Sequence, residues 1–234
     1  MGNLREKLLN SLKTERGIHS ETLLTAVGAL AGFAAQNAAL TQFTTPDPAG
    51  PRLGLSIARG RAREKYLFGD AVNVYLFPEP NSILPLFALI GGAVIQAGLT
   101  SDHLPDYKEM AAHIASVVGK TEFGLLRAPK DHQPQLQPLE LLRRFWPLAC
   151  NVIQLPLPKG IPPDREPPLK EIHWPIIISL VAAQFIAMTK EVLNPRISAA
   201  LVLECAIITS KIDPDTIDPG KWRIDEQGIT RLRN

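Results

Sequence analysis

Apolar residues recur at helical spacing along most of the chain. Near the N-terminus Leu4, Leu8, Leu9 and Leu12 lie on one side of an otherwise polar segment, which predicts an amphipathic helix stopped by Gly17. Ser20 is placed to cap the helix that follows. Similar patterns predict further helices over 21–40, 82–98, 105–118, 138–146, 175–192 and 195–210.

The predicted helix 21–40 is rich in small residues. Gly28 and Gly32 are four positions apart and so share one face of it. Each interior glycine costs a helix roughly 1 kcal/mol relative to alanine. Close approach of another backbone would offset that cost, so this helix is expected to be central and the most buried element.

Two stretches follow a strand pattern instead. Leu53, Leu55 and Ile57 alternate with small residues, and Arg59-Gly60 is typical of a turn. We therefore expect a small β element over 52–77, a hairpin with a short third segment. Alternation over 221–232 predicts a second, C-terminal hairpin. The fold class expected is mainly α, a compact helical bundle with these two β pieces in a single domain.

The segment 129–168 has a different composition, with ten prolines in forty residues. We expect a short helix over 138–146, a kink at Pro147, and then an extended arm. Such an arm either packs on the surface or binds a partner. Together with the excess of apolar helix, it favours a homo-oligomer.

Composition and charge narrow the function classes. The 234 residues carry 25 basic and 23 acidic side chains, a net charge of +2, which argues against a nucleic-acid-binding protein. Cys150 and Cys205 are too few for a disulfide framework and are expected to be buried free thiols. With no apolar secretory signal at the N-terminus, the cytoplasm is the expected compartment.

Three uncharged stretches, 22–46, 80–101 and 174–189, are long enough to raise the question of a membrane. Polar residues dilute the first, and prolines or glycines interrupt the second. The third begins at Pro175 and meets Lys190 soon after its apolar run. We interpret all three as buried helices and expect no membrane span.

The first candidate for chemistry is Asp70, which follows Gly69 at the end of an apolar strand. Asn73 could add an amide, and the pair could orient a water, a hydroxyl or a metal. The alternative is an Asx turn, in which the Asp70 carboxylate bonds nearby backbone N–H groups.

Other polar residues extend this candidate to a pocket between helix 21–40 and the Asp70 strand end. His19 precedes the helix and could meet an anion at its N-terminus. The candidate ligand-binding residues are His19, Glu21, Asp70, Asn73 and Lys211. No motif identifies a cofactor, and no histidine pair has the spacing of a zinc site.

A separate candidate is a set of alternate basic residues, Arg59, Arg61, Arg63 and Lys65. On one strand they would form a basic stripe about 20 Å long that could bind anions such as phosphates. The alternative is the solvated face of a hairpin.

Several runs of residues also resemble a group of uncharacterised bacterial proteins of similar length. They are Glu21-Thr22-Leu23-Leu24, Gly28-Ala29-Leu30-Ala31-Gly32-Phe33-Ala34-Ala35-Gln36, Phe68-Gly69-Asp70 and Ser210-Lys211-Ile212-Asp213. The resemblance spans most of the chain. It implies a bacterial cytoplasmic protein and lends no catalytic residue.

The sequence therefore favours a non-enzymatic binding or interaction protein that self-associates. The alternative is an enzyme or small-ligand-binding protein that uses the pocket near Asp70.

Overall fold

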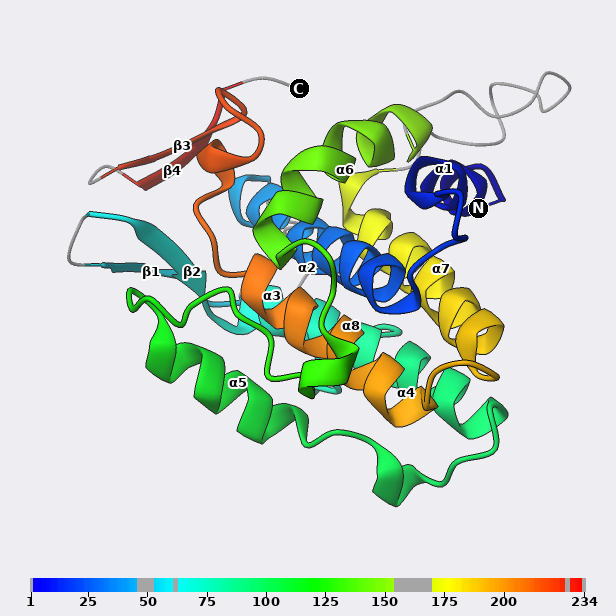
Figure 1. The fold of residues 1–234 in the computed structure, drawn as a ribbon. Helices are drawn as coiled ribbons and strands as arrows, with labels where there is room; N and C mark the ends of the chain where they lie inside the picture. Colours follow the sequence, from blue (N-terminus) through cyan, green and yellow to red (C-terminus); the bar gives the residue numbers. More distant parts are fainter. Residues whose placement is uncertain (1, 46–52, 61–62, 154–169, 226–227, 233–234) are drawn as a thin grey trace, which may run out of the picture.

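The computed structural model describes residues 2–45, 53–60, 63–153, 170–225 and 228–232. The fold is mainly α, as the sequence predicts (Figure 1). Its helices are α1 (Gly2–Leu12), α2 (Ser20–Thr44), α3 (Asp70–Leu76), α4 (Leu86–Gln96), α5 (Tyr107–Val117), α6 (Pro138–Ile153), α7 (Trp174–Thr189) and α8 (Pro195–Thr209).

Helix α2 is the centre of the molecule, with α6, α7 and α8 packed around it (Figure 1). Every residue from Thr22 to Leu40 is buried. A Cβ atom added to Gly28 would lie 2.6 Å from the backbone oxygen of Val202 in α8. The prediction of a central helix held close to another backbone is therefore confirmed.

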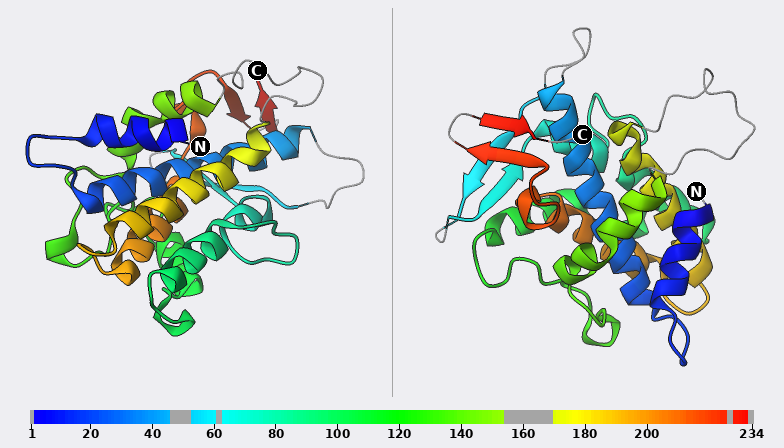
Figure 2. Two further views of the ribbon diagram at one scale, coloured as in Figure 1. Left: turned by 90° about the vertical axis from the view of Figure 1, so that its right-hand side faces the viewer. Right: turned by 90° about the horizontal axis from the view of Figure 1, so that it is seen from above.

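The two predicted hairpins are present and lie at the same end of the molecule (Figure 2, right). Strands β1 (Ser56–Arg59) and β2 (Lys65–Phe68) pair antiparallel, as do β3 (Trp222–Asp225) and β4 (Gly228–Arg231). A small apolar cluster from the hairpins and the end of α2 lies between them, made of Leu40, Leu67, Trp222 and Ile224.

The short third β segment expected within 52–77 is wrong, because that stretch forms helix α3. Gly69 has a φ of +128° and packs against the backbone of Gly54. This left-handed conformation turns the chain sharply after β2. Asp70 then begins the helix, where a negative charge interacts favourably with the helix dipole.

Some helix ends differ from their predictions. His19, not Ser20, caps α2, since its side chain accepts the backbone N–H of Thr22. Ser82 does not open α4, because its hydroxyl donates to the carbonyl of Phe77 in the preceding turn.

At α5 the cap is Asp106, and Pro105 lies just before the helix rather than in its first turn. The cap of α8 matches its prediction. The Asn194 side chain accepts the N–H of Arg196, with Pro195 in the first turn.

Helix α6 is longer than expected and continues through Pro147 to Ile153. Burial holds it together, because Phe145 and Trp146 are core residues and the Trp146 ring meets Phe33 edge-on at 4.6 Å. The predicted proline-rich arm lies largely outside the described residues.

Among the described residues, two helical stretches are long and apolar enough to cross a membrane by length and composition alone, Ser20–Thr44 and Glu171–Thr189. The most apolar 18-residue window of the first is entirely buried inside the fold, as in a core helix. Only half of the second is buried. An apolar helix face is therefore left on the surface.

Candidate functional site

Two of the predicted ligand-binding residues, His19 and Glu21, lie together at the start of α2, but they interact with each other and with His132. The Nδ1 atom of His132 lies 3.0 Å from a Glu21 oxygen, and His19 caps the helix. Burial acts to raise the pKa of Glu21, but the hydrogen bond to His132 and the nearby histidines outweigh it and lower that pKa. Glu21 thus already supplies the negative charge at this helix N-terminus, where an external anion was expected to meet His19.

Lys211 follows the C-terminal end of α8, beside the C-terminal half of α2. It is 6% exposed, and its ammonium lies 5.1 Å from the centre of the Phe68 ring. No hydrogen-bond acceptor is found for that ammonium among the described residues. Burial lowers the pKa of Lys211 to about 8. The backbone around it is fixed by Gln36, whose side chain donates to the carbonyls of Ser210 and Ile212.

The five predicted ligand-binding residues do not form one pocket. Glu21 precedes Gln36 by fifteen positions in α2, which places the Glu21 and Lys211 regions about 22 Å apart. Asp70 is exposed, and its carboxylate forms no hydrogen bond to a described residue, so the Asx turn named as the alternative does not form. Asn73 is half-buried in α3. Of this set, Lys211 alone combines burial with an unpartnered charged group in the described part of the chain.

The predicted basic stripe along one strand is wrong, because the chain folds back within it. Arg59 and Lys65 lie opposite each other on β1 and β2. Arg63 lies in the turn with a φ of +69°, and Arg61 is outside the described residues. Lys65 is also 3.7 Å from Asp213, so one of the four charges is partly neutralised.

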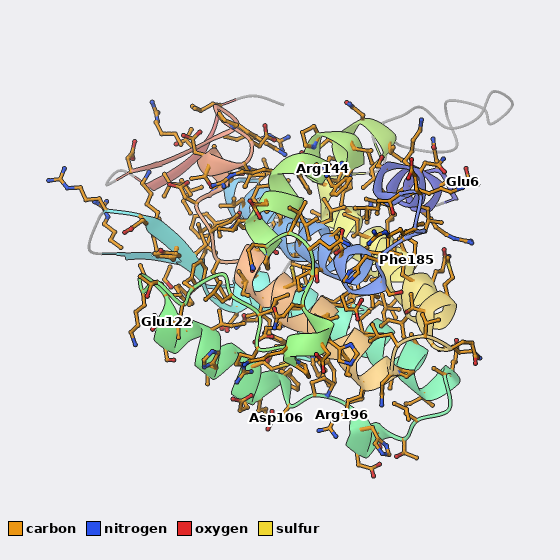
Figure 3. The ribbon with its side chains drawn as sticks, in the orientation of Figure 1. Glu6, Asp106, Glu122, Arg144, Phe185 and Arg196 are labelled. Atoms are coloured by element: carbon orange, nitrogen blue, oxygen red, sulfur yellow. The ribbon has the colours of Figure 1, made fainter. Side chains whose placement is uncertain are left out.

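A cleft of about 410 Å³ opens between α5, the start of α8 and the loop around Arg127. This volume is in the range of small-molecule sites. Met110, Ile197 and Leu201 supply apolar lining. The charged residues of the cleft are Asp106, Glu109, Arg127, Arg196 and Glu204. Figure 3 shows Asp106 and Arg196 near each other at the lower edge of the molecule.

Arg127 links the two helices of the cleft, because it bonds to Glu204 in α8 and to Glu109 in α5. Its Nε donates to Glu204 at 2.8 Å, and its backbone N–H donates to the other Glu204 oxygen at 3.0 Å. Its two terminal nitrogens donate to the two oxygens of Glu109 at 2.7 and 3.1 Å. These bonds raise the pKa of Arg127 and lower that of Glu109, so both stay charged. By formal charge, Arg127, Glu109 and Glu204 together carry −1.

Sequence reasoning missed this cleft. Glu204 gave one usable signal, since it is the one charged residue between Ile197 and Ser210 in an otherwise apolar helix. A charge there needs a partner if it is buried. Arg127 carried no local signal, because it lies in a loop 77 positions from Glu204.

The other surface of note is the outer face of α7, which carries no charged side chain along Trp174–Thr189. The apolar face, as we call it, comprises Ile176, Ile177, Leu180, Ala183, Gln184, Ala187 and Met188, all partly or fully exposed. Helix α7, in yellow, lies at the front of the molecule in Figure 2 (left). Helix α4 packs beside α7 and adds the exposed residues Gly92 and Ile95.

The described part of the chain contains neither a cluster of metal ligands nor a disulfide bond. No group of three or more His, Cys, Asp or Glu residues there is placed to hold a metal ion. Cys150 and Cys205 are both free thiols. Burial raises the pKa of Cys150 to about 12 and that of Cys205 well above its usual value, so neither is activated as a nucleophile.

Comparisons of the chain with protein-family models, with curated proteins and with solved structures each find no match.

Proposed function

We propose that this chain is a non-enzymatic bacterial cytoplasmic binding protein that self-associates, and that two copies meet through the apolar face of α7. The observation that carries the proposal is that face itself, a charge-free helix surface that the described residues leave partly or fully exposed. Exposed apolar surface of this kind is typical of protein–protein contacts.

The chemistry of the face favours a second copy as its occupant. A twofold contact places the same surface on both sides, so the surface must be complementary to itself. A face without charges meets this condition, because no like charges are brought together. Ala183 and Ala187 are small enough for two helices to approach closely, and the Gln184 amide can hydrogen-bond to its symmetry mate.

The two free cysteines support the cytoplasm as the compartment in this proposal. Cys205 is buried in the core, where its Sγ donates to the carbonyl oxygen of Thr25. Free thiols of this kind are typical of proteins in a reducing cytoplasm.

A matched pair of substitutions tests the proposal. Ala187 and Ala115 are both exposed, and each lies two residues before the end of its helix, α7 or α5. By size-exclusion chromatography with light scattering, the wild type and Ala115→Glu should be dimers at tens of micromolar. Ala187→Glu should be a monomer. A monomeric wild type, or a variant that associates as the wild type does, would contradict the proposal.

Lys211 favours a second candidate, an enzyme or small-ligand-binding protein with its site between α2 and the Phe68 strand end. A buried ammonium without an acceptor is costly, and such groups are often retained for a ligand. A panel of small carboxylates and aldehydes should then raise the melting temperature of the wild type but not of Lys211→Met. Absence of any shift in the wild type would remove this candidate.

A further inference from the structure

The cleft between α5 and α8 has two carboxylates on its α5 side and, on its α8 side, a cation, Arg196, that no described residue pairs with, and its chemistry is independent of the apolar face. The α5 side is negative. One oxygen of Asp106 accepts the backbone N–H groups of Lys108 and Glu109 at 2.9 and 3.2 Å. Its other oxygen has no hydrogen-bond partner among the described residues. Glu109 lies one turn further along the same helix and stays ionised beside Arg127.

The α8 side carries one cation, Arg196, and one carboxylate, Glu204, which is paired with Arg127. Arg196 lies in the first turn of α8, and its backbone N–H is already bonded to Asn194. Its exposed guanidinium makes no hydrogen bond or ion pair with a described residue, whereas all three guanidinium nitrogens of Arg127 donate to Glu109 or Glu204. Arg196 is therefore the cation in this cleft that is available to an incoming anion.

The cleft also has apolar lining residues. Met110 and Leu201 are almost completely buried, and Ile197 is half-buried beside them. Counting Asp106, Glu109 and Glu204 against Arg127 and Arg196, the cleft carries a net charge of −1. A simple anion would be repelled by that charge, and a simple cation would leave Arg196 unpaired.

We propose that this cleft binds a small dipolar molecule that carries a protonated amine and a carboxylate on a short apolar body, as an apolar α-amino acid does. The amine lies against Asp106 and Glu109, the carboxylate against Arg196, and the apolar body against Met110 and Leu201. This combination leaves neither side of the cleft without a partner of opposite charge.

Isothermal titration calorimetry with leucine and two analogues tests the proposal. The analogue 4-methylpentanoate lacks the amine, and 3-methylbutylamine lacks the carboxylate. Leucine should bind, and each analogue should bind at least about tenfold more weakly, since each loses a charge-assisted hydrogen bond. If leucine does not bind at millimolar concentration, or if either analogue binds as tightly as leucine, the proposal is wrong.

Two variants locate the site. Arg196→Gln removes the proposed carboxylate partner, and Asp106→Asn removes a charge while keeping a residue that caps helices well. Each should weaken leucine binding by about tenfold. The control is Arg143→Gln, at an exposed arginine on α6, which should bind as the wild type does. Unchanged binding in both cleft variants would overturn the assignment. Ala187→Glu should bind leucine normally, so this test is separate from that of self-association.

Discussion

The carboxylate of Glu204 accepts two hydrogen bonds from one residue, Arg127, through the side-chain Nε at 2.8 Å and the backbone N–H at 3.0 Å. Glu204 is 4% exposed and belongs to a helix that is otherwise apolar along its buried length. The pair therefore attaches the loop around Arg127 to the core and forms the base of the cleft.

Removing the Arg127 side chain from this pair should strongly destabilise the fold. Arg127→Met leaves Glu204 buried without its cation, and we expect a loss of about 3 kcal/mol in the free energy of unfolding. Urea denaturation measures it. The double variant Arg127→Met/Glu204→Gln should recover part of the loss, because the unpaired charge is gone. If the two substitutions simply add, the pair is not coupled as described.

The close contact between α2 and α8 predicts that replacing glycine by alanine destabilises the protein at Gly32, in the contact, but not at Gly92, outside it. A Cβ at Gly32 would overlap the backbone of Ala206, so Gly32→Ala should cost about 2 kcal/mol or more. Gly92, inside α4, has no heavy atom near an added Cβ, so Gly92→Ala should stabilise by up to about 1 kcal/mol. Thermal unfolding of the two variants compares them. Similar melting temperatures would mean that α2 and α8 are not in close contact.

The buried ammonium of Lys211 predicts a stability that depends on pH. Its pKa is about 8 in the folded protein and about 10.5 in the unfolded chain. Between these values the unfolded state binds the additional proton, so this group makes stability rise with pH. Below pH 8 both states are protonated, and the full cost of burying the charge remains.

Lys211→Met should therefore stabilise the protein at pH 7 by up to about 3 kcal/mol. Its advantage over the wild type should shrink as the pH rises from about 8 to 10.5. Chemical denaturation at a series of pH values measures both. A variant that is less stable than the wild type at pH 7 would show that the ammonium has a favourable partner.

The elements that could be predicted from the sequence are those with local signals. The Asn194 cap, the small-residue face of α2 and the two hairpins are each encoded within a few neighbouring residues. Helix α6 could not be delimited in this way. Pro147 would ordinarily end a helix, but burial of Phe145 and Trp146 in the core overrides the local preference.

The charged sites depend on residues that are far apart in the chain, which explains why they were predicted poorly. Glu21 meets His132 across 111 positions, and Arg127 meets Glu204 across 77. Spacing alone carries no information on such pairs. The sequence predicts Lys211 in a pocket with Asp70, whereas its burial against Phe68 follows from the packing of β2 on the end of α8.

The most direct test of the central claim, that two copies meet through α7, uses Met188. This residue lies on the apolar face and is 46% exposed, whereas Met110 is 4% exposed and serves as an internal control. Hydroxyl-radical oxidation followed by mass spectrometry should modify Met188 readily in dilute protein. The modification should fall at tens of micromolar in the wild type but not in Ala187→Glu. A Met188 oxidation rate that stays the same at every concentration in the wild type would contradict the account.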